Sequence, residues 1–159
     1  MDDPWVRLRD FRHALTRLGE VLASTRDRQV MVSALLDAST TYLGARCGVL
    51  WVTVAGSERL RPMETAGPPC APSELAAGSG LAGAAARTGG PVLWPGDGGA
   101  VRPAPQEPDG DGGAVAIPLR SGGHPFGVLA YYGRPTAFDG EDVDSLVILV
   151  RQAETAIEN

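Results

Sequence analysis

The glycine-rich segment GSGLAG, residues 78–83, has residue types and spacing that could bind a nucleotide. In dinucleotide-binding folds, G-x-G-x-x-G turns a strand into a helix whose N-terminus faces a pyrophosphate, and an acidic residue about 20 positions further on binds the ribose. Asp97 stands at a comparable separation here. However, the preceding PCAPSELAA contains no apolar strand, and the predicted element order is not β-α-β. We therefore expect no dinucleotide at this segment.

The other side chains that could carry chemistry are not grouped as a catalytic or metal site requires. His13 is predicted on the exposed side of a helix and His124 in a hairpin turn, and neither has a second metal ligand near it in sequence. None of the serines considered stands in a G-x-S-x-G segment: Ser79, Ser121 and Ser145. The acidic loop lacks an EF-hand pattern and is expected to be solvated: Asp97, Asp109 and Asp111. No catalytic residue and no metal site are expected, and the chain is predicted not to be an enzyme.

The cysteines Cys47 and Cys70 are too few for a disulfide framework and stand in different sequence contexts. Cys47 is expected to be a small apolar residue entering a strand. Cys70, in the Pro-rich GPPCAPSE, is expected to be an exposed loop thiol. A redox role for either thiol stays open.

Composition excludes several classes of partner. The chain has 159 residues, the size of one domain, and a net charge of -5. It contains no Lys, and its Arg residues are scattered singly, so no basic patch for nucleic acid or an anionic membrane is expected. No apolar run approaches the roughly 20 residues that span a bilayer, and the N-terminus lacks a signal-peptide pattern, so we expect a cytoplasmic location and no membrane insertion.

Both ends of the chain are predicted to be helical, over about 4–23 and 139–158, and each helix carries an apolar seam with spacings of three and four. The seam residues are Leu8, Phe11, Leu15, Leu18 and Leu22 in the first helix, and Val143, Leu146, Val150, Ala153 and Ile157 in the last. Two chains could pair in parallel through these seams as a homodimer. The alternative is that each seam covers its own sheet.

Between these helices the patterns predict a second helix to about residue 43, a short helix over 80–87 and several strands. The expected strands are 47–54, a weaker edge strand in ERLRPMETAG (58–67), 91–94, and a hairpin within 114–132. Long loops at 67–77 and 95–113 separate them. This order implies an α+β domain with an antiparallel sheet.

Taken in order, these segments resemble the GAF domain family. GSGLAGAAARTGGPVLWPGD is similar to the family's signature around a short helix and its third strand, and CGVLWVTV is similar to its first strand. FDGED and the helix after it resemble the final turn and helix. The resemblance implies a six-stranded antiparallel sheet with helices on one face. It also implies a ligand pocket on the other face, between the sheet, the short helix and the loops 67–77 and 95–113.

Ligands of this family include cyclic nucleotides, bilins, haem and amino acids, and the sequence departs from several of these patterns. The N-K-F-D-E motif of cyclic-nucleotide binders is absent, Cys70 is not followed by the His of bilin binders, and neither histidine is placed to hold haem. The two cysteines do not reproduce the pattern of free methionine sulfoxide reductases of this fold. An uncharged or weakly polar ligand, or none, is expected.

Alternation along the strands suggests which residues converge on such a pocket. The candidates are Trp51, Leu81, Ala85, Trp94, Ile117 and Tyr131. Trp94 is favoured because it stands where a strand meets the loop 95–113. The alternative is that all six are ordinary core residues.

The resemblance favours a non-catalytic sensory domain from a larger cytoplasmic bacterial signalling protein, because the chain begins and ends in a helix as an excised domain would. Its output domain could be a diguanylate cyclase, histidine kinase or phosphatase. Two alternatives stay open. One is a dimerisation or protein-docking module without a ligand, and the other is a small redox enzyme that uses Cys70 or Cys47.

Overall fold

The computed structural model describes residues 3–96, 98, 101–108 and 112–159. Its helices are α1 (Pro4–Ser24), α2 (Arg28–Leu43), α3 (Gly80–Thr88) and α4 (Gly140–Glu158). Its strands are β1 (Cys47–Thr53), β2 (Leu60–Ala66), β3 (Val92–Trp94), β4 (Gly113–Ser121) and β5 (His124–Arg134). The expected α+β class is confirmed.

The strands form one antiparallel sheet in the order β2-β1-β5-β4-β3, so that β5 is the central strand. Within the described residues the sheet has five strands, whereas the family resemblance implied six. Pro62 lies in β2, at one edge, where its missing N–H breaks no ladder hydrogen bond to a further strand. The weak strand signal at residues 58–67 thus corresponds to an edge strand.

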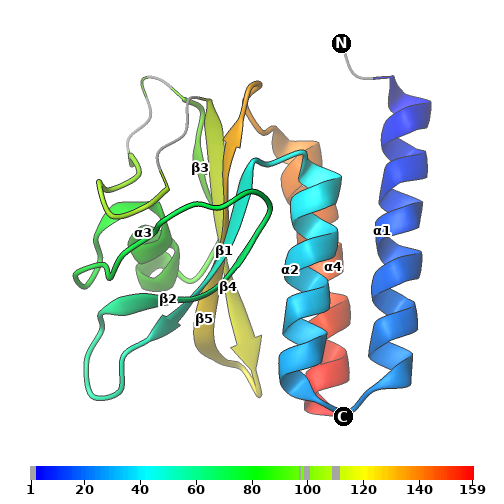
Figure 1. Ribbon diagram of the computed structural model, residues 1–159, viewed down its shortest axis with the longest axis horizontal. Coiled ribbons are helices and arrows are strands. Elements are labelled where there is room, and N and C mark those ends of the chain that lie inside the picture. Colours follow the sequence, from blue (N-terminus) through cyan, green and yellow to red (C-terminus); the bar gives the residue numbers. More distant parts are fainter. Residues whose placement is uncertain (1–2, 97, 99–100, 109–111) are drawn as a thin grey trace.

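Helices cover the two faces of this sheet unequally (Figure 1). α2 and α4 pack against one face and α1 lies outside them, whereas α3 lies alone against the other face. Each face has its own apolar core, one shared with the three long helices and one shared with α3. The three-helix side is thick and continuous, so any small-molecule site is more easily built on the α3 side.

Local capping fixes where the long helices begin and end. The side chain of Asp27 accepts a hydrogen bond from the backbone of Gln29 and starts α2, and Gly44, at φ 67°, ends it. Asp139 and Asp142 form a reciprocal capping box at the start of α4. These short polar signals separate the helices that the apolar pattern alone would run together.

The α1 and α4 helices run side by side and are joined at their first turns (Figure 1). Arg7 contacts Oδ1 of Asp139 at 2.8 Å and Oδ1 of Asp142 at 2.5 Å. The other oxygen of Asp142 contacts Arg134 at 2.6 Å. Because the Asp142 side chain is only 5% exposed, these two guanidinium groups supply the charge that its burial requires.

The apolar seams of the terminal helices are used largely inside the chain. Leu18, Leu146 and Val150 are buried, and most other seam residues pack against the same core. Leu8 is the exception, with 50% of its surface exposed. Within one chain the α4 seam therefore helps to cover the sheet, whereas the α1 seam packs against α2 and α4.

The α2 helix approaches the sheet most closely at Gly48 of β1. A Cβ atom built at this position would overlap Oγ1 of Thr40 and lie 3.1 Å from Cδ1 of Leu36. Glycine is therefore required by the close approach of helix and strand. The Thr40 hydroxyl is itself buried and, among the described residues, has no hydrogen-bond partner.

Candidate functional site

The face of the sheet beneath α3 has a solid centre. Trp51 of β1 and Tyr132 of β5 are buried there and pack with Leu81 and Ala85 of α3. The indole Nε1 of Trp51 donates a hydrogen bond to the Tyr132 hydroxyl at 3.2 Å. These aromatic side chains fill the middle of the space where the family resemblance placed a ligand.

A buried carboxylate completes this centre from above. Glu107 belongs to the segment 101–108, which we call the strap, and is only 3% exposed. Its Oε1 accepts hydrogen bonds from the backbone N–H groups of Leu81 at 2.6 Å and Ala104 at 2.8 Å. Its Oε2 accepts from the N–H of Ala82 at 3.2 Å and from the hydroxyl of Tyr132. The N-terminus of α3 therefore binds a carboxylate of its own chain.

The first residue of α3, Gly80, must be a glycine because the Glu107 carboxylate lies so close to it. Gly80 has φ +69°, and a Cβ atom at this position would overlap Oε1 of Glu107. The second glycine of G-x-G-x-x-G thus admits a carboxylate in the way that dinucleotide folds admit a phosphate. Gly80 does face an anion, but the anion is a side chain.

The electrostatics of this network favour a protonated phenol. Burial raises the pKa of Tyr132, and the negative charge of Glu107 raises it further. Tyr132 consequently remains a hydrogen-bond donor to the carboxylate throughout the physiological pH range. Among the described residues no Arg bonds to Glu107, whose charge is stabilised by backbone N–H groups and one hydroxyl.

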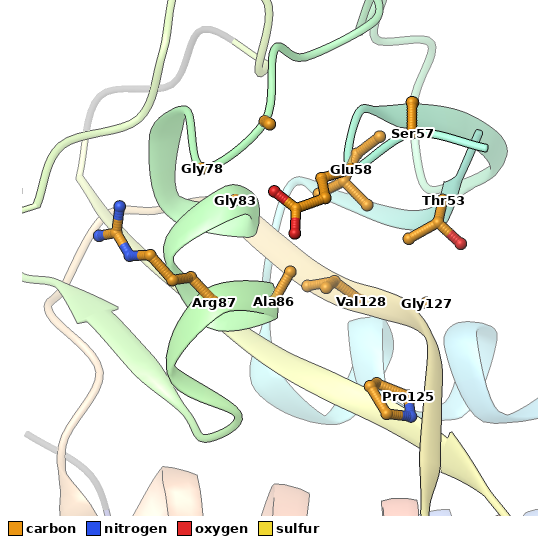
Figure 2. A pocket seen from close by; sticks show the side chains of 12 residues that line it. Thr53, Ser57, Glu58, Gly78, Gly83, Ala86, Arg87, Pro125, Gly127 and Val128 are labelled. Atoms are coloured by element: carbon orange, nitrogen blue, oxygen red, sulfur yellow. The ribbon is translucent and has the colours of Figure 1, made fainter. Parts of the chain in front are cut away.

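A cavity of about 450 Å³, which we call the α3 cavity, opens beside this centre (Figure 2). Its walls come from the β1–β2 turn, from α3 and from the start of β5. Leu60, Ala86 and Val128 contribute apolar surface, and Glu58 and Arg87 contribute opposite charges. In Figure 2 the Glu58 and Arg87 side chains lie on different sides of α3, so they do not neutralise each other. Glycines at positions 78, 83 and 127 also line the cavity.

A second cavity, of about 600 Å³, lies beneath the strap. Trp94, Arg102, Glu107 and Tyr132 are among its lining residues. Its polar groups are already engaged, because Glu107 accepts four hydrogen bonds and the Arg102 guanidinium lies 5.6 Å from the centre of the Trp94 ring. This cavity offers less unsatisfied polar surface than the α3 cavity does.

The residues predicted to converge on a pocket divide between the two faces. Trp51, Leu81, Ala85 and Trp94 lie together in the core on the α3 side. Ile117 and Tyr131 lie on the opposite face, in the core shared with the long helices, where the Tyr131 hydroxyl is 2.6 Å from that of Ser39. The expectation for these two residues was wrong by one position in the strand alternation, since Tyr132 takes the place assigned to Tyr131.

Glu107 was missed by sequence reasoning, which treated residues 95–113 as a loop with almost nothing to pack. Its neighbours in sequence are polar residues and prolines, and no pattern marks a buried acid there. The only available signal was the glycine-rich helix start at residues 78–83, which predicts an anion partner without saying where in the chain it stands.

The remaining candidates do not form a site. His13 and His124 are exposed and lie on different elements, and Ser79 precedes α3 without capping it through its side chain. Asp97, Asp109 and Asp111 lie outside the described residues. Across the residues that the structure describes, no group of three His, Cys, Asp or Glu side chains is placed to hold a metal ion. No helix among them is both long and apolar enough to cross a membrane.

The two cysteines are bonded to each other, contrary to the expectation of an isolated strand residue and a free loop thiol. The Cys47–Cys70 disulfide joins the first residue of β1 to the segment that precedes α3. No sequence pattern indicated this pairing, because the cysteines are separated by 23 positions that span the β1–β2 hairpin, and only the fold brings them together.

These observations define an α+β domain with an antiparallel sheet, a three-helix layer on one face and a short helix over cavities on the other. The chain belongs to the GAF domain family, whose model matches residues 25–158. No curated protein sequence is similar enough to match the chain.

Solved structures show the same fold at low sequence identity. A free methionine-R-sulfoxide reductase from Neisseria meningitidis, in complex with its substrate, is 22% identical with a TM-score of 0.79 over 93% of this chain and 88% of that chain. The GAF domain of a phosphoenolpyruvate-protein phosphotransferase from Coxiella burnetii is 17% identical with a TM-score of 0.74 over 93% and 92%. A type II free methionine-R-sulfoxide reductase from Thermoplasma acidophilum is 18% identical with a TM-score of 0.64 over 82% and 95%.

The reductases correct the prediction that the chain is not an enzyme. They have the fold of this chain and act as enzymes, so the fold is compatible with catalysis. The prediction relied on the absence of familiar hydrolase and metal motifs and on a cysteine pattern that differs from that of the reductases, and neither excludes catalysis by this fold. The absence of such motifs therefore does not make the domain non-catalytic.

Proposed function

We propose that this chain is a regulatory GAF domain that binds a small molecule in the α3 cavity. The observation that carries the proposal is the cavity itself, whose volume of about 450 Å³ lies within the range of known ligand sites, about 300–1,000 Å³. It combines an apolar floor with two charges that are not paired with each other (Figure 2). A related fold has been solved with a small substrate bound, which supports the general idea.

The lining favours a ligand with an apolar part and at least one charged end. Leu60 and Val128 would contact the apolar part, while Glu58 and Arg87 would attract a cationic and an anionic group respectively. This differs from the uncharged or weakly polar ligand, or the absence of a ligand, expected from sequence. Two matched variants would distinguish cationic from anionic ligands. Glu58→Gln should weaken the binding of cationic ligands, and Arg87→Gln should weaken the binding of anionic ones.

Thermal unfolding with a metabolite library tests the proposal. A ligand at 100 times its Kd stabilises the fold by about 2.7 kcal/mol, which corresponds to roughly 5–10 °C in a domain of this size. Ala86→Phe, which places a ring in the cavity, should abolish the shift. Thr88→Phe is the matched control, because Thr88 is exposed on the same helix and does not line the cavity.

Two results would contradict binding in the α3 cavity. One is a library in which no compound stabilises the wild type, which would favour the docking module without a ligand. The other is a stabilising compound whose shift is unchanged in Ala86→Phe, which would place its site elsewhere.

We also propose that the domain acts as a homodimer and passes its state to an output domain of a larger signalling protein. α1 is the outermost helix and exposes Trp5 and Leu8, while α4 exposes Ile148. These apolar side chains are available to a second copy after the rest of the seams has been used internally. Ligand binding would act by shifting the population of helix arrangements in the dimer.

A further inference from the structure

The Cys47–Cys70 disulfide ties down a segment that has few other attachments. Residues 67–74 are mostly exposed, and none of them contributes a large side chain to the buried core. Beyond the disulfide, the segment is held at its end by an ion pair between Glu74 and Arg59 at 2.8 Å and by a pair of backbone hydrogen bonds between Leu60 and the buried Leu75, at 3.1 and 2.8 Å. We call residues 67–74 the Cys70 segment.

This segment is bonded directly to the strap. The backbone N–H of Ser73 donates to the carbonyl oxygen of Gln106 at 2.9 Å. Gln106 is the residue before Glu107, whose carboxylate holds the strap to the N-terminus of α3. A displacement of the Cys70 segment would therefore pull on the residue next to the strap's main anchor.

The disulfide also lies close to Tyr132, the sheet residue that bonds to Glu107. Cys47 and Tyr132 are register partners on the neighbouring strands β1 and β5, and both belong to the core on the α3 side. Tyr132 is the side chain that donates to Glu107 from the sheet. The disulfide is thus connected to Glu107 by two routes. One runs through Tyr132 of β5, and the other runs through Ser73 and Gln106.

We propose that Cys47–Cys70 is a redox modification site, reduced by a dithiol, that controls whether the strap is held closed over the N-terminus of α3. In the disulfide form the Cys70 segment supports the strap and Glu107 caps α3. In the dithiol form the segment is released, and the Glu107 contacts open more often. This goes beyond ligand binding in the α3 cavity and does not depend on it.

The reaction is a thiol–disulfide exchange. A thiolate of the reductant attacks the sulfur of Cys70, because Cys70 is half-buried whereas Cys47 is 3% exposed. The S–S bond breaks, a mixed disulfide forms on Cys70, and Cys47 leaves as a thiolate and takes up a proton. The second thiol of the reductant then attacks the reductant sulfur that is bonded to Cys70. Cys70 leaves as a thiolate and takes up a proton. The protein gains two electrons and two protons, and the dithiol becomes a disulfide.

Hydrogen exchange on the wild-type protein, oxidised and reduced with dithiothreitol, tests the proposal without any substitution. The amides of Leu81, Ala82 and Ala104 bond to Glu107 and should exchange at least tenfold faster after reduction. Amides of Leu35 and Leu36, buried in α2, should keep their rates. The double variant Cys47→Ser, Cys70→Ser should show the fast exchange whether or not reductant is present.

Three results would overturn the proposal. The first is a protein whose mass shows no disulfide after oxidation. The second is equal exchange of the three Glu107-bound amides in both states, which would make the crosslink purely structural. The third is acceleration of the α2 amides by the same factor, which would indicate global destabilisation. Glutathione should form its mixed disulfide on Cys70, and a mixed disulfide on Cys47 would contradict the order of attack.

Discussion

The hydroxyl of Tyr132 donates a hydrogen bond to the carboxylate of Glu107, and both side chains are almost completely buried. The bond joins the central strand of the sheet to a segment without regular secondary structure, 25 residues earlier in the chain. The first turn of α3 completes the arrangement with two further N–H donors. The strap and the short helix are thus positioned by one carboxylate.

Removal of this carboxylate should destabilise the protein strongly. Glu107→Ala leaves buried N–H groups without an acceptor, and each such group costs about 1–3 kcal/mol, so we expect a loss of roughly 2–4 kcal/mol in the free energy of unfolding. Glu107→Gln retains an acceptor oxygen and should lose less. Urea titration measures both. Glu20→Ala, an exposed substitution on α1, is the control, and an equal loss in Glu20→Ala and Glu107→Ala would contradict the role of Glu107.

Stability at low pH should depend on Asp139. The hydrogen bond from Arg7, followed by that from the backbone of Asp142, lowers the pKa of Asp139 from 3.8 to about 2. The unfolded chain therefore binds the proton first, and the stabilisation is present above pH 4 and is lost as the pH falls towards 2. The carboxylate is 59% exposed, so solvent limits the effect to about 1 kcal/mol or less.

Urea titrations between pH 2 and pH 5 check this dependence around the cited pKa of about 2. Asp139→Asn should flatten the curve in that interval. Asp144→Asn, on the exposed side of α4, should leave its shape unchanged. A wild-type curve that matches that of Asp139→Asn would show that the Arg7 contact has no effect in solution.

The contact between α2 and β1 should show strong coupling in a double-mutant cycle. Gly48→Ala forces a methyl group against Oγ1 of Thr40 and should cost about 1–3 kcal/mol of unfolding free energy. Thr40→Ala removes that oxygen, which has no hydrogen-bond partner in the described structure, and makes room for the methyl group. The double variant should therefore be more stable than the sum of the single effects predicts. Strict additivity would contradict the predicted overlap.

Substitutions in the exposed part and in the buried part of the α1 seam should have different effects on the oligomeric state and on stability. Leu8→Glu should convert a dimer into a monomer while changing the unfolding free energy by no more than about 0.5 kcal/mol, because Leu8 is half exposed. Leu18→Glu should instead prevent folding, because Leu18 is buried. Light scattering at tens of micromolar measures the first effect. A monomeric wild type at that concentration would refute the homodimer.

Apolar periodicity in the sequence was sufficient to predict the helices and most strands. Asp3, Asp27 and Asp139 cap the three long helices because their short side chains reach nearby backbone N–H groups, a purely local interaction. The continuous apolar run of β1 likewise predicted a strand in the interior of the sheet correctly, since only a strand covered on both faces tolerates it.

The candidate site was less predictable because it depends on contacts between distant segments. Strand alternation cannot assign Tyr131 and Tyr132 to faces, since two consecutive apolar aromatics satisfy either phase. The Cys47–Cys70 bond and the anchoring of Glu107 both require loops to return to the sheet, and loop paths leave no periodic signal. The heptad spacing of the terminal helices was real, but it does not indicate whether the partner is the same chain or another.

The order of strands also bears on how the protein avoids self-association through its sheet. A sheet that is not closed into a barrel has two free edges, and an unprotected edge can template pairing with another molecule. Here one edge is β2, which carries Pro62 beside the charged Arg61 and Glu64, and the other is β3, with only three residues. Neither edge offers a long, uninterrupted row of backbone donors and acceptors. The architecture therefore disfavours fibre-like aggregation and leaves the helical side as the surface through which copies would meet.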